Sequence, residues 1–286
     1  MKKYKTIFSV ILFISILFAP ALELSAQESP AGIKGLYKKD IRDKSPIPYT
    51  HLREADVMWS KKIFREIDLR KKINQPLYYP TTPIGDRVSL INIILAEIKS
   101  GTVNAYDAME GDDMTVKITQ ADIDNKMGAK SDSAASYRTA SGELRDTIVI
   151  EPPRPEEIKT IWLQEEWFFD KKHSKMDVRI LGIMPIRNYF NRESNESQKT
   201  QVCWIYYPDF RDTFASHEIY NPDNDAHRIS FDDFFMQRRF SSVIIAESNV
   251  YNNRQVSLYE TGKEALIEAE RIKEYIFNVE HDLWEY

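Results

Sequence analysis

Two histidines ten residues apart enclose a carboxylate-rich segment, the first place in this sequence where metal chemistry could occur. The segment reads HEIYNPDNDAH, with His217 and His227 at its ends and Asp223 and Asp225 between them. Histidine nitrogens bind zinc, and alternating carboxylates open a calcium loop. However, the glycine and the later glutamate of an EF-hand are missing, and Asn-Pro-Asp-Asn-Asp is ordinary turn chemistry. The sequence therefore predicts a turn, with no bound metal or cofactor.

The adjacent carboxylates Glu165 and Glu166 are the second arrangement that could do chemistry, because glycosidases place two carboxyl groups around one bond. Neighbouring residues of a strand point to opposite faces, so this pair cannot easily share a substrate. The sequence also has no G-x-S-x-G, P-loop, H-E-x-x-H or C-x-x-C motif. No catalytic residue is assigned, and we expect that the chain is not an enzyme.

An aromatic and basic segment over residues 56–80 is the stronger candidate for a function. Its sequence, DVMWSKKIFREIDLRKKINQPLYYP, could bind nucleic acid, a membrane surface or another protein. Tryptophan, tyrosine and arginine are the usual anchors of protein interfaces. The candidate partner contacts of this kind are Trp59, Arg65, Arg70, Tyr78 and Tyr79.

A helix and a proline-bounded stretch are the elements that would position these anchors. The apolar residues at helical spacing are Val57, Ile63, Phe64, Ile67 and Ile73. They predict an amphipathic helix over residues 55–72, which the prolines of QPLYYPTTP end. If the stretch after it is extended, consecutive side chains point in opposite directions. The more exposed of Tyr78 and Tyr79, together with Arg65 or Arg70, is therefore expected at an interface.

The first 26 residues have the order of a secretory signal peptide: lysines, an apolar run, and a polar stretch that ends at Ala26. The apolar run is shorter than the ~20 residues of a spanning helix, and Pro20 interrupts it. We expect cleavage before Gln27; an uncleaved anchor is the alternative. Loss of three lysines and one glutamate from 39 basic and 44 acidic residues leaves a formal charge of −7. An acidic, exported chain is not expected to bind nucleic acid.

The single cysteine, Cys203, bears on both stability and membrane attachment. One cysteine cannot form an internal disulfide, and it is too far from the signal to carry a lipid at the new N-terminus. Within the apolar run QVCWIYYP it is either a buried small side chain or a bond to a partner. Any membrane association is expected to be indirect, through a partner.

Local signals predict an α+β fold of mixed helices and antiparallel strands. Ser89 and Gly101 are suitable caps for a buried helix over residues 90–100. Residues 112–146 are small and polar, which predicts a long mobile loop. The other predicted elements are an extended arm at 27–50, strands at 102–108, 202–207 and 243–247 and in DTIVIEPPRP, a hairpin of 167–169 with 178–183, and helices at 231–240 and 262–286.

Two halves of the chain share an order of short motifs, which suggests two divergent repeat units; chance is the alternative. Both contain Trp, then Phe-Arg followed by an acidic residue, then a Tyr-Pro bend or its Tyr-Asn-Pro variant. The best-matched pieces are RVSLIN at 87–92 and RISFDD at 228–233. The expected organisation is a signal peptide at 1–26, an arm at 27–50, a first α/β unit at 51–111, a flexible polar loop at 112–146, and a second α/β unit with a C-terminal helix at 147–286, which forms one compact domain with the first.

Two longer blocks give the chain a family resemblance. MWSKKIFREIDLRKKINQPLYYP, together with EEWFFDKKHSKMDVRILGIMP, resembles the gliding motility and secretion family GldN, also called PorN, of the Bacteroidetes type nine secretion system. The resemblance covers nearly all of the mature chain but gives no match over residues 112–146. It implies a structural protein of the periplasm at the inner face of the outer membrane, with no catalytic residues.

The resemblance also implies partners. The family assembles with the lipoprotein GldK, or PorK, into a large ring of like or unlike subunits, and this ring meets the periplasmic end of the GldL and GldM motor. Two alternatives come from other function classes: a periplasmic metal-assisted hydrolase acting at HEIYNPDNDAH, and a cell-wall-binding module that uses exposed aromatic residues. Migration as a megadalton assembly or as a free monomer would distinguish the ring subunit from both.

Overall fold

The computed structural model describes residues 43–85, 87–138, 144–191, 195–221, 224 and 226–284. Within residues 130–150, and at Trp284, the backbone alone is described. The expected signal peptide at 1–26 and most of the expected arm, 27–42, lie outside the described residues. In the part that is described, no helix combines the length and the apolar composition needed to cross a bilayer.

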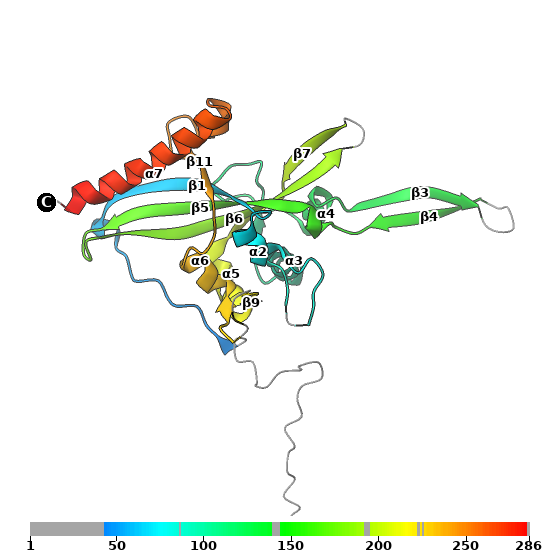
Figure 1. Ribbon diagram of the computed structural model, residues 1–286. Helices are drawn as coiled ribbons and strands as arrows, with labels where there is room; N and C mark the ends of the chain where they lie inside the picture. Colours follow the sequence, from blue (N-terminus) through cyan, green and yellow to red (C-terminus); the bar gives the residue numbers. More distant parts are fainter. Residues whose placement is uncertain are drawn as a thin grey trace, which may run out of the picture. The chain divides into compact units, whose positions relative to one another are not determined.

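A sheet of seven antiparallel strands forms the centre of the fold (Figure 1). Its order is β11-β1-β5-β6-β8-β2, and β7 pairs with β6. The strands of this sheet are β1 (Val57–Asp68), β2 (Ala105–Tyr106), β5 (Ile158–Asp170), β6 (Lys175–Asn191), β7 (Glu196–Gln201), β8 (Trp204–Tyr206) and β11 (Val243–Glu247). Two further pairs are β3 (Lys130–Arg138) with β4 (Leu144–Glu151), and β9 (Glu218–Ile219) with β10 (Ile229–Ser230).

The helices complete an α+β fold, which confirms the predicted class. The α-helices are α2 (Gln75–Tyr78), α3 (Leu90–Ser100), α4 (Gln120–Lys126), α5 (Tyr207–Ser216), α6 (Phe231–Met236) and α7 (Lys263–Trp284). The short 3-10 turns are η2 (Glu54–Asp56), η3 (Lys72–Asn74), η4 (Pro155–Glu157) and η5 (Val256–Leu258).

The capping residues predicted from the sequence correctly located the starts of two of these helices. The Ser89 side chain accepts a hydrogen bond from the backbone N–H of Asn92, and Gly101 ends α3 with a φ of 75°. Ser230 and Asp233 form a reciprocal capping box at the start of α6. The predicted hairpin is also confirmed, since β5 pairs with β6 and Trp167 lies opposite Val178.

The segment predicted as a helix over residues 55–72 is instead the strand β1. It lies between β5 and β11, and both of its faces are covered: Ile63 packs against α7, whereas Phe64 packs against Trp204. A bulge between Phe64 and Arg65 further interrupts the ladder with β11. A strand that is covered on both faces need not alternate apolar and polar residues. The apolar residues of β1 are therefore not confined to every second position, and their spacing matches that of a helix.

Three clusters of buried apolar side chains hold the elements together. The largest joins the sheet to α3, α5 and α6 and contains a group of aromatic rings around Phe214. The second joins α7 to β1 and β11, with Ile272 and Ile276 against Ile63 and Ile244. The third lies on β1, β6 and β8, where partly buried residues after β2 pack against it. Strand β1 contributes a buried side chain to each of the three clusters.

The region predicted as a long mobile loop, 112–146, contains regular structure. Thr119 caps α4 by accepting a hydrogen bond from the backbone N–H of Asp122. Farther along, β3 pairs with β4 over most of its length. A two-stranded ribbon satisfies backbone groups within the pair, so the polar strand β3 is ordered by pairing with β4, which contains Ile148, Val149 and Ile150.

The two proposed repeat units do not have the same structure. Residues 64–66 lie in the strand β1, whereas the matching residues 210–212 lie in the helix α5. The shared feature is the capped start of α3 and of α6. The ranges 51–111 and 147–286 also share one sheet, because β1 pairs with both β5 and β11. They belong to one compact unit.

The described end of the arm is held against the body by two arginines. The ring of Tyr49 has the guanidinium carbon of Arg179 at 4.9 Å and that of Arg211 at 4.1 Å. Arg211 also donates to the carbonyl of Ile47 at 2.7 Å, and Arg179 donates to that of Thr50 at 2.6 Å. These contacts position residues 47–50 against α5 and β6.

Cys203 is expected to resist thiol reagents in the native protein. The side chain is 1% exposed, and burial raises its pKa to about 12, so the reactive thiolate is scarce at about pH 8. We expect negligible maleimide labelling of the folded chain and complete labelling in concentrated urea, measured by intact mass. Equal labelling rates in both conditions would show that the thiol is not buried.

Candidate partner-binding groove

An apolar groove of about 410 Å³ lies beside α2 and opens to solvent. A second depression of about 320 Å³ adjoins it and shares Gln75 and Tyr79 with it. The groove is lined by Lys72, Gln75, Pro76, Tyr79, Pro80, Ile84, Arg87 and Tyr220. The second depression is lined by Leu69, Arg70, Gln75, Tyr78, Tyr79 and Lys159.

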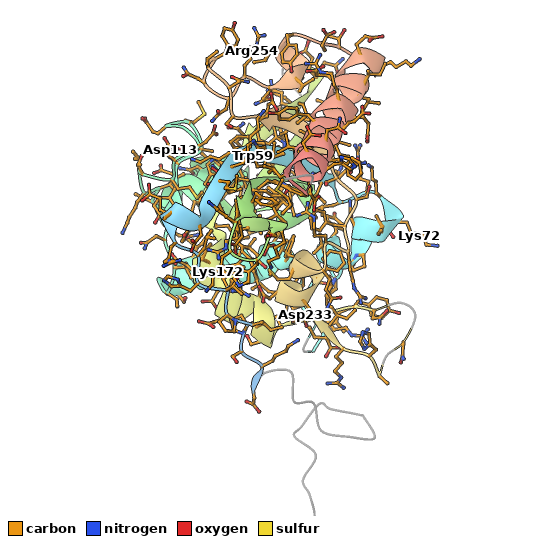
Figure 2. All side chains as sticks on the ribbon, turned by 90° about the vertical axis from the view of Figure 1, so that its left-hand side faces the viewer. Trp59, Lys72, Asp113, Lys172, Asp233 and Arg254 are labelled. Carbon is orange, nitrogen blue, oxygen red and sulfur yellow. The ribbon has the colours of Figure 1, made fainter. Side chains whose placement is uncertain are left out.

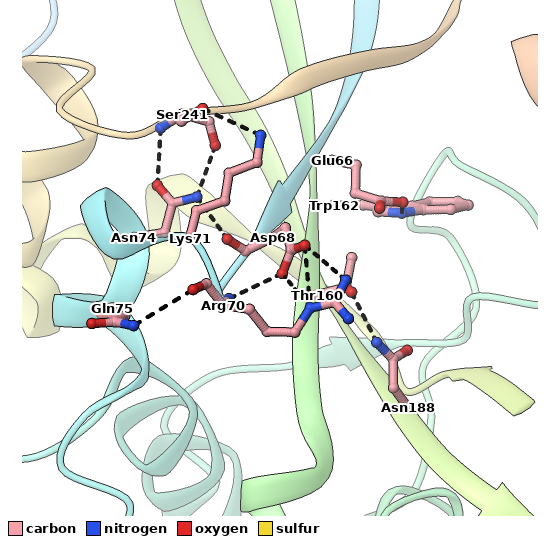
Figure 3. A network of polar contacts seen from close by, with 10 residues as sticks. All are labelled: Glu66, Asp68, Arg70, Lys71, Asn74, Gln75, Thr160, Trp162, Asn188 and Ser241. Atoms are coloured by element: carbon pink, nitrogen blue, oxygen red, sulfur yellow. Dashed lines mark hydrogen bonds and ion pairs between the residues drawn. The ribbon is translucent and has the colours of Figure 1, made fainter. Parts of the chain in front are cut away.

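A polar network at the end of β1 positions the groove (Figure 3). The Asp68 carboxylate accepts hydrogen bonds from Arg70, with Nη2 at 2.8 Å, and this contact lowers the pKa of Asp68. The buried Asn74 side chain donates to the carbonyl of Asp68 at 2.8 Å and to that of Ser241 at 2.9 Å. It also accepts from the Ser241 N–H at 2.9 Å. Asn74 thus ties the turn after β1 to the segment before β11 and fixes the start of α2.

Tyr78 and Tyr79 face different surroundings. Tyr78 donates its hydroxyl to the carbonyl of Glu156 at 2.8 Å, and partial burial raises its pKa. Tyr79 follows α2 with extended backbone, is 55% exposed, and lines both depressions. The two rings meet edge to face with centroids 4.8 Å apart. Tyr79 is therefore accessible to a partner, while the ring of Tyr78 packs against the ring of Tyr79.

The structure gathers three of the five candidate contacts and separates the other two. Arg70, Tyr78 and Tyr79 line adjoining surface. Arg65 is only 9% exposed and is held inside the fold, which corrects the expectation that it could lie at an interface. Trp59 is half-buried and packs against the cluster beneath α7.

Three groove residues lie outside the segment 56–80 and were not considered as contacts: Ile84, Arg87 and Tyr220. The guanidinium of Arg87 lies over the Tyr220 ring, with its carbon 4.8 Å from the ring centroid. Both residues stood out in the sequence only as positions of the proposed repeat. Their contact joins distant parts of the chain, so no local pattern could have shown it.

Arg65 belongs to a buried ionic cluster between β1, β5 and the segment after α6. The Glu165 carboxylate is 0% exposed and lies 2.9 Å from Arg65 Nε. Arg238 Nη2 lies 2.9 Å from Oε1 of the same carboxylate and donates to Oε2 at 3.2 Å. Trp167 Nε1 also donates to it at 3.0 Å. Burial lowers the pKa of Arg65, and the neighbouring Glu165 opposes that shift. Glu166 is the next residue of β5 and points to the opposite face of the sheet, so the two glutamates do not form one site.

The histidine segment has the contacts of a turn. His217 Nδ1 lies 2.8 Å from the carbonyl of Thr213 at the end of α5. The Asn224 side chain accepts a hydrogen bond from the Ala226 N–H, as in an Asx turn. Asp223 and Asp225 lie outside the described residues. Among the side chains that the structure describes, no group of three or more potential metal ligands comes together.

The comparison with protein families gives a match over residues 52–285, to the family described as gliding motility associated protein GldN. The matched range contains the groove, the buried ionic cluster and α7. No curated protein matches the chain. Because the family match covers most of the sequence, it confirms the resemblance read from the two blocks. The chain belongs to the gliding motility associated protein GldN family.

Proposed function

We propose that this gliding motility protein is a structural subunit of the periplasmic ring of the type nine secretion machinery. The observation that carries the proposal is the family match over residues 52–285. The subunit assembles with the lipoprotein GldK, or PorK, at the inner face of the outer membrane. The ring meets the periplasmic part of the GldL and GldM motor, and the chain contributes contacts rather than catalysis.

Two features of the structure support a role in assembly. Tyr79 and Tyr220 are exposed around an apolar groove, and aromatic residues are enriched among the anchors of protein interfaces. Cys203 is buried, so its thiol is not placed to carry a lipid. Attachment to the membrane is therefore assigned to a partner.

Deletion of the lipoprotein gene tests this proposal. We expect the chain to leave the outer-membrane fraction and to appear in the soluble periplasm or to be degraded, because its attachment to the membrane is made through the lipoprotein. Immunoblots of fractionated envelopes measure this, and restoring the lipoprotein gene from a plasmid is the control. Unchanged retention in the membrane fraction of the deletion strain would refute the proposed attachment.

A further inference from the structure

The outer side of α7 carries exposed apolar side chains. The helix packs on the sheet through Ala269, Ile272 and Ile276. Leu266 and Phe277, about three turns apart, lie on a different side of the helix and are exposed, Phe277 to 65%. Grouped exposed apolar residues on a protein surface mark interaction sites. We define the α7 surface as Glu264, Leu266, Ile267, Glu274, Tyr275 and Phe277.

The same helix is acidic. Residues 263–284 contain six carboxylates and three lysine or arginine residues. Two of these cations pair with glutamates of the helix itself. Glu264 and Glu274 are exposed, and neither has an ion-pair partner among the side chains that the structure describes. The α7 surface is therefore apolar with an excess of negative charge.

The groove beside α2 has the opposite charge. Lys72 and Arg87 line it, Arg70 and Lys159 line the adjoining depression, and among the residues that the structure describes neither lining includes a carboxylate. Asp68 pairs with Arg70. Lys72 and Lys159 are exposed and have no ion-pair partner among the described side chains. The groove is therefore apolar with an excess of positive charge, which complements the α7 surface.

We propose that the groove of one copy of this chain binds the α7 surface of a second copy. This rests on the proposed function, in which the chain is a ring subunit. Apolar side chains of α7 fill the groove, and its unpaired glutamates face Lys72 and Lys159. The occupant is a second copy because the complementary surface, apolar and oppositely charged, is present in the chain itself.

The positions of the two surfaces allow the contact to propagate. Figures 1 and 2 show α7 apart from α2 and from Lys72, so one copy can use both surfaces at once. The contact joins unlike surfaces of neighbouring subunits, which makes it heterologous. Heterologous contacts produce a ring when the rotation between neighbours closes.

Cross-linking between two cysteine variants tests the contact directly. Ile84→Cys places a thiol in the groove and Phe277→Cys places one on the α7 surface, both at exposed positions. Each full chain is purified separately with a different tag, mixed with the other, and treated with a short bismaleimide. We expect a mixed dimer, and a ladder of higher multimers from a chain that carries both substitutions. Buried Cys203 is not expected to react with the bismaleimide, and the wild-type chain treated in the same way is the control for this.

Charge reversal makes the test specific. Adding Lys72→Glu and Lys159→Glu to the groove variant is expected to lower the mixed-dimer yield about tenfold, because like charges then face each other. Adding Glu264→Lys and Glu274→Lys to the α7 variant is expected to restore it. Phe190→Cys replaces Phe277→Cys as the control, since Phe190 is exposed on the β6–β7 ribbon, away from α7.

Three results would overturn the inference: no mixed dimer, the same yield with the Phe190 control, or no response to charge reversal. Co-purification with the lipoprotein is measured in parallel on the same variants. If the groove substitutions abolish that co-purification while no mixed dimer forms, the groove binds the lipoprotein instead. The proposed function would then stand and this inference would fail.

Discussion

Replacing Glu165 with glutamine is expected to lower the free energy of unfolding by about 3–5 kcal/mol, the usual effect of removing one partner from a buried ion pair. The carboxylate is 0% exposed and lies 2.9 Å from both Arg65 and Arg238. The neutral amide removes the carboxylate that contacts the buried guanidinium of Arg65 and the half-buried guanidinium of Arg238. Urea denaturation, monitored by circular dichroism, measures the change in the free energy of unfolding.

The neighbouring residue provides a matched control for this prediction. Glu166 is half-buried on the same strand, and we expect Glu166→Gln to change the free energy of unfolding by less than about 0.5 kcal/mol. The two variants have the same chemistry and differ in burial and in arginine contacts. Equal effects at both positions would mean that the ionic cluster does not stabilise the fold.

Replacing Phe214 with alanine is expected to cost about 3–5 kcal/mol, the usual loss when a buried phenylalanine is truncated. Its ring is fully buried in α5. The centroids of Phe210 and Tyr207 lie 5.6 and 5.7 Å away, and those of Phe235 and Phe231 lie 6.3 and 6.4 Å away. Truncation leaves a cavity that these rigid rings cannot close. The measurement is again urea denaturation.

Phe190→Ala is the control for the cavity, because that ring is 60% exposed and its loss creates none. We expect its effect to stay within about 0.5 kcal/mol. A comparable loss at both positions would indicate that the aromatic cluster is not the centre of the core. An intermediate loss for Phe214→Leu, which keeps most of the side-chain volume, would support the cavity explanation.

The candidate contacts within residues 56–80 lie in different surroundings at the two ends of the segment. The sequence predicted that the more exposed of Tyr78 and Tyr79 faces outward if the proline-bounded stretch is extended. The structure instead ends the helix α2 at Tyr78, and the exposed residue is Tyr79, which follows with extended backbone. Arg65 was selected by residue type alone, yet it is paired with Glu165 inside the fold. Whether an arginine faces solvent or a buried carboxylate depends on a strand a hundred residues away.

Features whose physics is local could be predicted before the fold was known. Helices α3 and α6 start at serine caps because a side-chain oxygen reaches a backbone N–H three residues later. The β5–β6 hairpin followed from two apolar strands joined by a short polar turn. The family was indicated by two long blocks of sequence, and the family match over residues 52–285 confirms it.

Features that depend on distant partners could not be predicted in this way. Residues 55–72 have helical spacing, but pairing with β5 and β11 and burial on both faces make them the strand β1. The ribbon of β3 and β4 forms because each strand satisfies the backbone of the other. The groove exists because Tyr220 and Arg87 meet beside α2. Contacts of this kind are decided by the packing of the whole chain, so no short window of sequence contains them.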